Sequence, residues 1–445
     1  MVENDARALQ HAMPLRSRRM VREGRVQHPP HVGADCGGRR RLAGDFRQAE
    51  IMVNGSLTQR WQHPGMDVRE FLHWLESAAP AGRSEAAESL ARAWLSGEAD
   101  DETRSGLEAT LTLLLDDAAP EVRLALAQTL ADSPIAPRHI ILGLAADQAE
   151  IACLVLSRSP VFIDAELVDI VAAAAEPLQT AIATRPRVSS AVAAAVAEVG
   201  EERACRALID NPGAEIARIS LRRMAERFGD DAAMRERLLA RPNLPPDIRH
   251  MLIRRLSDAL TDFVVDKAWV PESRARMLTR DACDRATVAI AAETETAELP
   301  ALVEHLRVTG QLNTALLLRA VCAGNIGLFE TAVSVLARVP AARVASLVRA
   351  GRINALRSVY TRARLPASAF DAFAAAIEAC RGIAENGGPR DRYRFTRHMV
   401  DSVLARYRDI SAGEANELAS MLRRFAADQA RDAARDFARD AIAAA

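Results

Sequence analysis

Two groups of arginines are the residues whose type and spacing best suit binding chemistry. One group lies in a predicted helix and the other in the next predicted repeat: Arg218, Arg222, Arg223, Arg249, Arg254 and Arg255. A guanidinium group donates hydrogen bonds in a planar fork that matches a carboxylate or a phosphate. Because equivalent faces of stacked repeats align, the two groups predict a basic stripe on one face of the protein.

The charge balance around this stripe favours a solvated, salt-bridged face over a binding site. Residues 201–260 hold 12 arginines against 10 aspartates and glutamates, and the whole chain has a formal net charge of −1. Lys267 is its single lysine. Nucleic-acid binding needs several phosphate contacts, each releasing counterions, and a surplus of two charges is small for that purpose. An acidic protein partner and nucleic acid are the two binding alternatives.

Motifs for catalysis or metal binding are missing from the sequence. It contains no GxGxxG, P-loop, GxSxG or HExxH pattern. Imidazole and thiolate groups suit zinc, but the spacing of the four candidates matches no closed site: His28, His31, Asp35 and Cys36. Glu304 and His305 are expected at ordinary surface positions. We therefore expect no cofactor, no metal and no enzymatic activity.

The cysteines and the hydropathy pattern predict a cytoplasmic protein. Six cysteines are far apart and form no CxxC pair, which is typical of reduced core thiols: Cys36, Cys153, Cys205, Cys283, Cys322 and Cys380. No apolar run approaches the roughly 20 residues that a membrane-spanning helix needs. The N-terminal arginines lead into His28, Pro29 and Pro30 rather than into the apolar core of a signal peptide.

A repeating leucine or isoleucine followed four residues later by proline defines the fold class. The pairs are Leu130/Pro134, Leu156/Pro160, Ile182/Pro186, Leu208/Pro212 and Leu238/Pro242, so successive prolines are 26, 26, 26 and 30 residues apart. Proline lacks the amide donor and ends the preceding helix, and about 26 residues hold two short helices with two turns. Such hairpins bury their apolar faces only by stacking, so we predict an all-α, HEAT-like α-solenoid with a C-terminal helical extension.

Composition divides the chain into four parts. The first is rich in Arg, Gly, His and Pro and is expected to be disordered, or untranslated if Met52 or Met66 is the true start. The stretch 264–270 is locally strand-like, but it is short and is expected to be a helix end or loop. The last helix carries Asp/Arg pairs and sparse apolar residues, which fits either a solvated terminal helix or a helix for a partner. The predicted parts are 1–65 (the N-terminal segment), 66–290 (the repeat array), 291–385 (a second helical-repeat region) and 386–445 (a C-terminal helical unit).

Several motifs resemble a known bacterial family. They include Arg185-Pro186, Asp210-Asn211-Pro212 and the run from Leu239 to Pro245, followed by later runs at 316–320, 324–329 and 360–366. Over residues 100–385 the sequence resembles the alphaproteobacterial domain of unknown function 2336 family, which is built from HEAT-like helices. The resemblance implies a fold but no reaction, and it supplies no functional residue to carry over.

The sequence as a whole favours a non-enzymatic scaffold that mediates protein–protein interaction. A stacked helical array needs only a complementary surface for this role. The alternative is a nucleic-acid-binding helical-repeat protein that uses the arginine stripe. No pattern in the sequence predicts the oligomeric state.

Overall fold

A computed structural model describes residues 73–74, 77–386, 392–407 and 413–443. The predicted N-terminal segment 1–65 lies outside these residues. Within the described residues every regular element is a helix, and an isolated parallel bridge joins Val188 to Ala214. The prediction of an all-α protein is therefore confirmed for this part of the chain.

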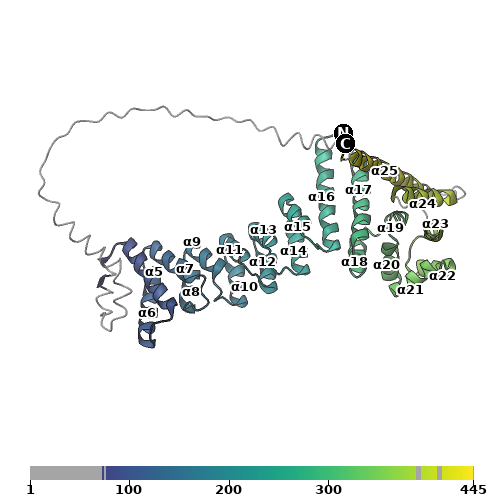
Figure 1. Cartoon of the computed structure of the whole chain (residues 1–445). Coiled ribbons are helices and arrows are strands. Elements are labelled where there is room, and N and C mark those ends of the chain that lie inside the picture. The colour runs from purple at the N-terminus through teal and green to yellow at the C-terminus, as the bar shows by residue number, and fades with distance from the viewer. Residues whose placement is uncertain (1–72, 75–76, 387–391, 408–412, 444–445) are drawn as a thin grey trace, which may run out of the picture. The chain divides into compact units, whose positions relative to one another are not determined.

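The first half of the described chain is a series of short helices (Figure 1). They are α5 (Pro80–Ser96), α6 (Asp101–Leu113), η1 (Leu114–Asp116), α7 (Pro120–Leu130), α8 (Arg138–Ala145), α9 (Ala149–Arg158), α10 (Asp164–Ala173), α11 (Glu176–Ala183), α12 (Ser190–Val199), α13 (Glu202–Asp210), α14 (Arg218–Phe228), α15 (Ala232–Ala240) and α16 (Pro246–Asp266). Each of the five prolines that define the period lies in a connection between two of these helices. The predicted effect of proline on the preceding helix is therefore observed at all five positions.

Helices in this series pack against their next-but-one neighbours. One row is formed by α5, α7, α9, α11, α13 and α15, and a second row by α10, α12, α14 and α16. The local cause is amphipathicity, as in α9, where Ile151, Ala152, Val155 and Leu156 are the buried residues. Side chains of Ser189 and Asp231 cap α12 and α15 by accepting hydrogen bonds from backbone amides.

The polar residues that precede the prolines link successive repeats. Arg185 donates to the carbonyl oxygens of Leu156 and Ser159, at the end of α9. In the following repeats, Asn211 donates to the carbonyls of Ala183 and Arg185, each at 2.8 Å, and Arg241 donates to that of Ile209 at 2.8 Å. The last carbonyls of a helix have no partner within that helix. These side chains therefore satisfy the end of one helix from the next repeat.

Two long helices follow the short ones. Helix α16 has 21 residues and α17 (Glu272–Glu293) has 22, and they pack against each other. The stretch 264–270 contains the end of α16 at Asp266 and the turn before α17, so the expectation of a helix end or loop is confirmed.

The remaining helices share one hydrophobic core that extends from Val288 to Phe425. They are α18 (Leu299–Val308), α19 (Thr314–Cys322), α20 (Ile326–Ala337), α21 (Ala341–Arg349), α22 (Ile353–Arg362), η2 (Ala367–Ala369), α23 (Phe370–Asn386), α24 (Arg392–Tyr407) and α25 (Gly413–Ala443). Phe329 and Phe373 stack in this core with ring centroids 4.9 Å apart. Gly310, Gly324 and Gly351 have positive φ at turns, a conformation that a residue without a Cβ atom adopts easily.

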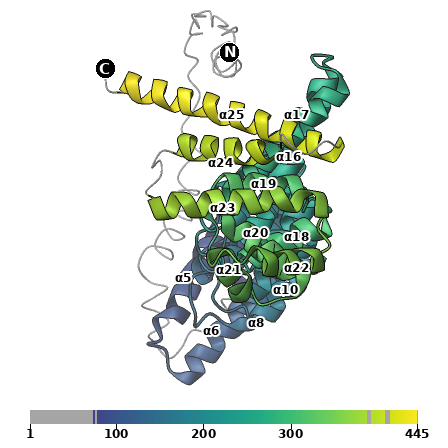
Figure 2. The same cartoon turned by 90° about the vertical axis from the view of Figure 1, so that its right-hand side faces the viewer.

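The last three helices lie side by side, with α24 between α23 and α25 (Figure 2). Leu422 and Phe425 of α25 are buried, so its apolar residues in this part pack within the chain. No described helix is long and apolar enough to cross a membrane.

Candidate functional site

Two of the predicted arginines converge on one buried carboxylate. Arg218 and Arg222 lie one turn apart on α14, and each donates to a different oxygen of Asp247. Asp247 is in the first turn of α16, directly after Pro246 in the sequence, and its side chain is fully buried. The acidic residue also lies near the positive end of the helix dipole. Because two guanidinium groups and the helix terminus compensate the carboxylate, it can be buried at this junction between α14 and α16.

A pair of histidines lies next to this carboxylate. The rings of His250 on α16 and His305 on α18 meet edge to face, with centroids 5.3 Å apart. Burial lowers the pKa of His250 to about 4, with smaller contributions from the neighbouring His305 and Arg254. Burial also lowers the pKa of His305, while Asp247 opposes this change. Both rings are therefore neutral near pH 7, and burial makes each a weaker base than an exposed imidazole.

The other four predicted arginines pair with separate carboxylates. Arg223 forms two hydrogen bonds to Glu198 of α12, at 2.8 and 2.9 Å, and Arg255 donates to Asp230 at 2.6 Å. Arg249 lies 3.4 Å from Glu293 of α17, and Arg254 lies 3.1 Å from Asp258 on its own helix. The structure thus brings Arg218 and Arg222 together and places the remaining four apart, each beside a negative charge. This arrangement agrees with the salt-bridged face favoured by the charge balance.

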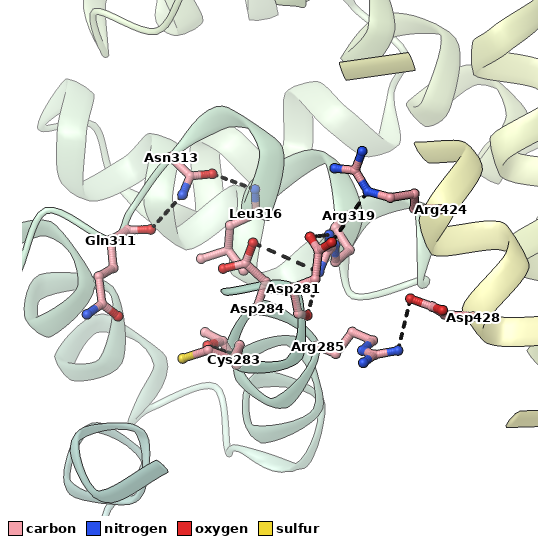
Figure 3. A network of polar contacts seen from close by, with 11 residues as sticks. Asp281, Cys283, Asp284, Arg285, Gln311, Asn313, Leu316, Arg319, Arg424 and Asp428 are labelled. Carbon is pink, nitrogen blue, oxygen red and sulfur yellow. Dashed lines mark hydrogen bonds and ion pairs between the residues drawn. The ribbon is translucent and has the colours of Figure 1, made fainter. Parts of the chain in front are cut away.

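A second charged cluster, which was not predicted from the sequence, is centred on Arg319 (Figure 3). Arg319 is on α19, its side chain is 2% exposed, and it donates to the backbone and side-chain oxygens of Asp281 at 2.9 and 3.0 Å. Asp284 lies 3.9 Å away, and Arg424 of α25 lies 3.4 Å from Asp281. The cluster therefore joins α17, α19 and α25. Its signal in the sequence was an arginine inside the apolar run 316–322.

Burial disfavours the charged form of one carboxyl group in this cluster. It raises the pKa of Asp284, and Arg319 partly opposes the change. The Nε atom of Arg319 has no hydrogen-bond partner among the described residues, although the guanidinium lies 5.5 Å from the ring of Phe425. Nearby, Asp428 of α25 bridges Arg285 and Arg431, each at 3.0 Å. The Arg285–Asp428 pair holds α25 against α17.

An apolar cavity of about 310 Å³ lies between α20, α21 and α23. Its lining residues are Ile326, Glu330, Val348, Arg349, Ile377, Cys380 and Arg381. Burial raises the pKa of the Glu330 carboxyl and of the Cys380 thiol, so this thiol is less readily ionised than an exposed cysteine.

Metal-binding groups of three or more His, Cys, Asp or Glu residues are absent from the part of the chain that the structure describes. The four residues weighed for zinc, 28, 31, 35 and 36, lie outside it. The described cysteines are free thiols. Glu304 is exposed, as expected, and pairs with Arg307. The expected surface position of His305 is wrong, because its ring is half-buried against His250.

In its described residues the chain is all-helical, and the charged clusters above join one helix to another. The chain belongs to a family described as an uncharacterised protein conserved in bacteria (DUF2336), which matches residues 151–413. The predicted family resemblance is therefore confirmed. The match covers residues 151–413, whereas the motifs suggested residues 100–385. Neither the curated proteins nor the solved structures include a match to the chain.

Proposed function

We propose that the protein is a non-enzymatic helical-repeat scaffold that binds a protein partner, with its short helices arranged as an α-solenoid. The contacts between next-but-one helices support the solenoid, because each helix then buries its apolar face between equivalent neighbours. Hydrogen bonds from Arg185, Asn211 and Arg241 to the preceding repeat support the same arrangement.

The observation that carries the proposal is an asymmetry between the two helix series. Helices α8, α10, α12 and α14 each carry one exposed large apolar residue, within the helix or at its N-cap: Leu142, Ile163, Val199 and Ile219. The alternate helices α7, α9, α11, α13 and α15 have none. Apolar side chains that recur on one helix series offer contacts to another protein, because their burial in an interface removes them from water.

The pairing of the six predicted arginines weighs against nucleic acid as the partner. Each of them already contacts a carboxylate, so binding a phosphate would require breaking an ion pair. The cytoplasmic location expected from the sequence stays a prediction.

The test is affinity purification of the tagged full-length chain from its own bacterial cells, divided into nuclease-treated and untreated halves. We expect a stoichiometric protein partner in both halves. The variant Ile163→Asp/Ile219→Asp should lose this partner, because it places two charges on the apolar helix series. Val308→Asp is the matched control, since Val308 is as exposed as Ile219 but lies on α18 (70% and 73%).

Two results would contradict the scaffold proposal. Partners that disappear on nuclease treatment would assign the arginine face to nucleic acid. A partner retained equally by both variants and the wild type would show that the α8–α14 series is not the binding surface.

A further inference from the structure

The outer halves of α16 and α17 form a helical hairpin tip, defined here as residues 258–280. Five large apolar side chains of the tip are between 42% and 69% exposed: Leu260, Phe263, Trp269, Met277 and Leu278. Phe263 and Trp269 contact each other edge to face, with centroids 5.6 Å apart, but neither is covered. Exposed large apolar residues elsewhere in the described chain are more widely spaced, so the tip is their densest group in sequence.

The tip has almost no core of its own in which these side chains could be buried. Thr261 and Ala275 are its only buried residues, and the hydroxyl of Thr261 donates to that of Thr279 across the two helices at 2.9 Å. Figure 1 shows α16 and α17 as a long pair beside the shorter helices. A narrow seam of small residues joins the two helices, and it leaves the larger apolar groups on their outer faces.

Helical spacing separates the apolar and charged residues of the tip. Leu256, Leu260 and Phe263 recur at i, i+4 and i+7 on α16, which places them along one face. A different face of α16 carries the aspartates at 258, 262 and 266. On α17, residues 274, 276 and 280 are arginines. One arm of the tip is therefore acidic and the other basic, and the tip as a whole contains four acidic and four basic residues.

We propose that two copies of this chain associate through their tips, in a two-fold arrangement that places α16 of one copy against α17 of the other. In such an arrangement the same patch occurs on both sides, so it must be complementary to itself. The tip meets this requirement, because its acidic arm would face the basic arm of the second copy and its apolar residues would form the centre of a four-helix bundle. An anionic membrane or nucleic acid would instead favour a positive patch, and the tip is neutral.

The size of the patch is adequate for a dimer. Five large side chains at about half exposure offer on the order of 500 Å² per copy, taking roughly 200 Å² for each when free. The charged residues beside them bring this area toward the roughly 800 Å² per partner that a standard interface buries. Asp262 and Arg274 have no salt-bridge partner within the described part of the chain, so both are available for an intermolecular pair.

The first test is the mass of the full-length chain by sedimentation equilibrium over a hundredfold range of concentration. The wild type should be a dimer, and Leu260→Asp/Phe263→Asp should weaken the association at least tenfold. Both side chains are exposed in the single chain, so the variant should fold, and its circular dichroism should match that of the wild type. Val308→Asp again serves as the control, because it adds a charge at an exposed apolar residue outside the tip and should leave the dimer unchanged.

A charge exchange tests the arrangement of the two copies. Asp262→Arg and Arg274→Glu should each weaken self-association, because like charges then face each other in both contacts. An equal mixture of the two variants should recover the dimer as a heterodimer, since each contact regains opposite charges.

The proposal is overturned if the wild type is monomeric at every concentration, if the double aspartate variant remains dimeric, or if the mixture does not recover. A monomer that binds phosphatidylcholine vesicles through the tip would assign the patch to a lipid surface instead. These results do not depend on the α8–α14 surface, so the scaffold proposal and the dimer can fail separately.

Discussion

Replacement of His250 by glutamine should reduce the loss of stability that the protein undergoes in mild acid. His250 is buried between α16 and α18, and its pKa falls from the ordinary 6.5 to about 4 in the folded protein. Because the folded pKa is below the unfolded one, the unfolded chain binds the proton first as the pH falls. The stability associated with the neutral ring is present above pH 6.5 and is lost as the pH falls toward 4.

The size of this effect follows from the two pKa values. At 1.36 kcal/mol for each pH unit between them, the complete loss is about 3 kcal/mol, of which about 2 kcal/mol has occurred by pH 5. We would measure the free energy of unfolding by urea titration at pH 7.5 and pH 5.0, followed by circular dichroism at the helical band. The wild type should lose about 2 kcal/mol more than His250→Gln between these two pH values.

Carboxylates also lose stabilising contacts in acid. The test is therefore the difference between the wild type and His250→Gln in their loss of unfolding free energy, rather than the loss in the wild type alone. His305 is present in both proteins and contributes to both measurements. His139→Gln is the control for replacing a histidine at an exposed position, on α8. If His250→Gln loses as much stability as the wild type on acidification, the reasoning that burial keeps this ring neutral is refuted.

Three further substitutions test how the helices are held together. Arg319→Met should cost about 3–5 kcal/mol of unfolding free energy, because it removes the buried guanidinium that pairs with two partly buried aspartates. Arg424→Met, at a side chain 44% exposed, should cost less than about 1 kcal/mol, and equal costs in urea titrations would contradict this. Asp247→Asn should destabilise by about 1–3 kcal/mol, since two arginines lose charge-assisted hydrogen bonds to their shared carboxylate, and an unchanged melting temperature would exclude that role. Leu156→Asp should prevent stable folding because it buries an unpaired charge, while Leu142→Asp, at an exposed residue, should fold normally by circular dichroism.

The helix order was predictable because it depends on local signals. Proline ends a helix whatever surrounds it, so the five regularly spaced prolines located five connections correctly. Glycines at 310, 324 and 351 lie at turns for a similarly local reason, since positive φ is easily adopted only without a Cβ atom. The family resemblance rested on these same structural motifs and therefore indicated the fold without an activity.

The partners of the charged side chains were not predictable in the same way. Arg222 and Asp247 are 25 residues apart, and Arg319 and Asp281 are 38 residues apart, so their pairing depends on how separate helices pack. Helical spacing placed Arg218 and Arg222 on one helix, but it gave no sign that both reach a single buried carboxylate. The expectation that His305 lies at the surface was wrong for the same reason, since its neighbour His250 is 55 residues earlier in the chain and on another helix.

The contacts of the arginines give a physical reason why a chain with one lysine suits this architecture. Arg185 reaches two carbonyl oxygens in the preceding repeat, and Arg123 forms two hydrogen bonds to Asp147 at 2.6 and 3.0 Å. A guanidinium group can make such paired bonds in a fixed plane, whereas an ammonium group is a compact charge without that geometry. Arginine at these positions therefore fixes the distance and the orientation between neighbouring helices. A substitution such as Arg185→Lys keeps the charge but loses the fork, which separates a geometric role from a merely electrostatic one.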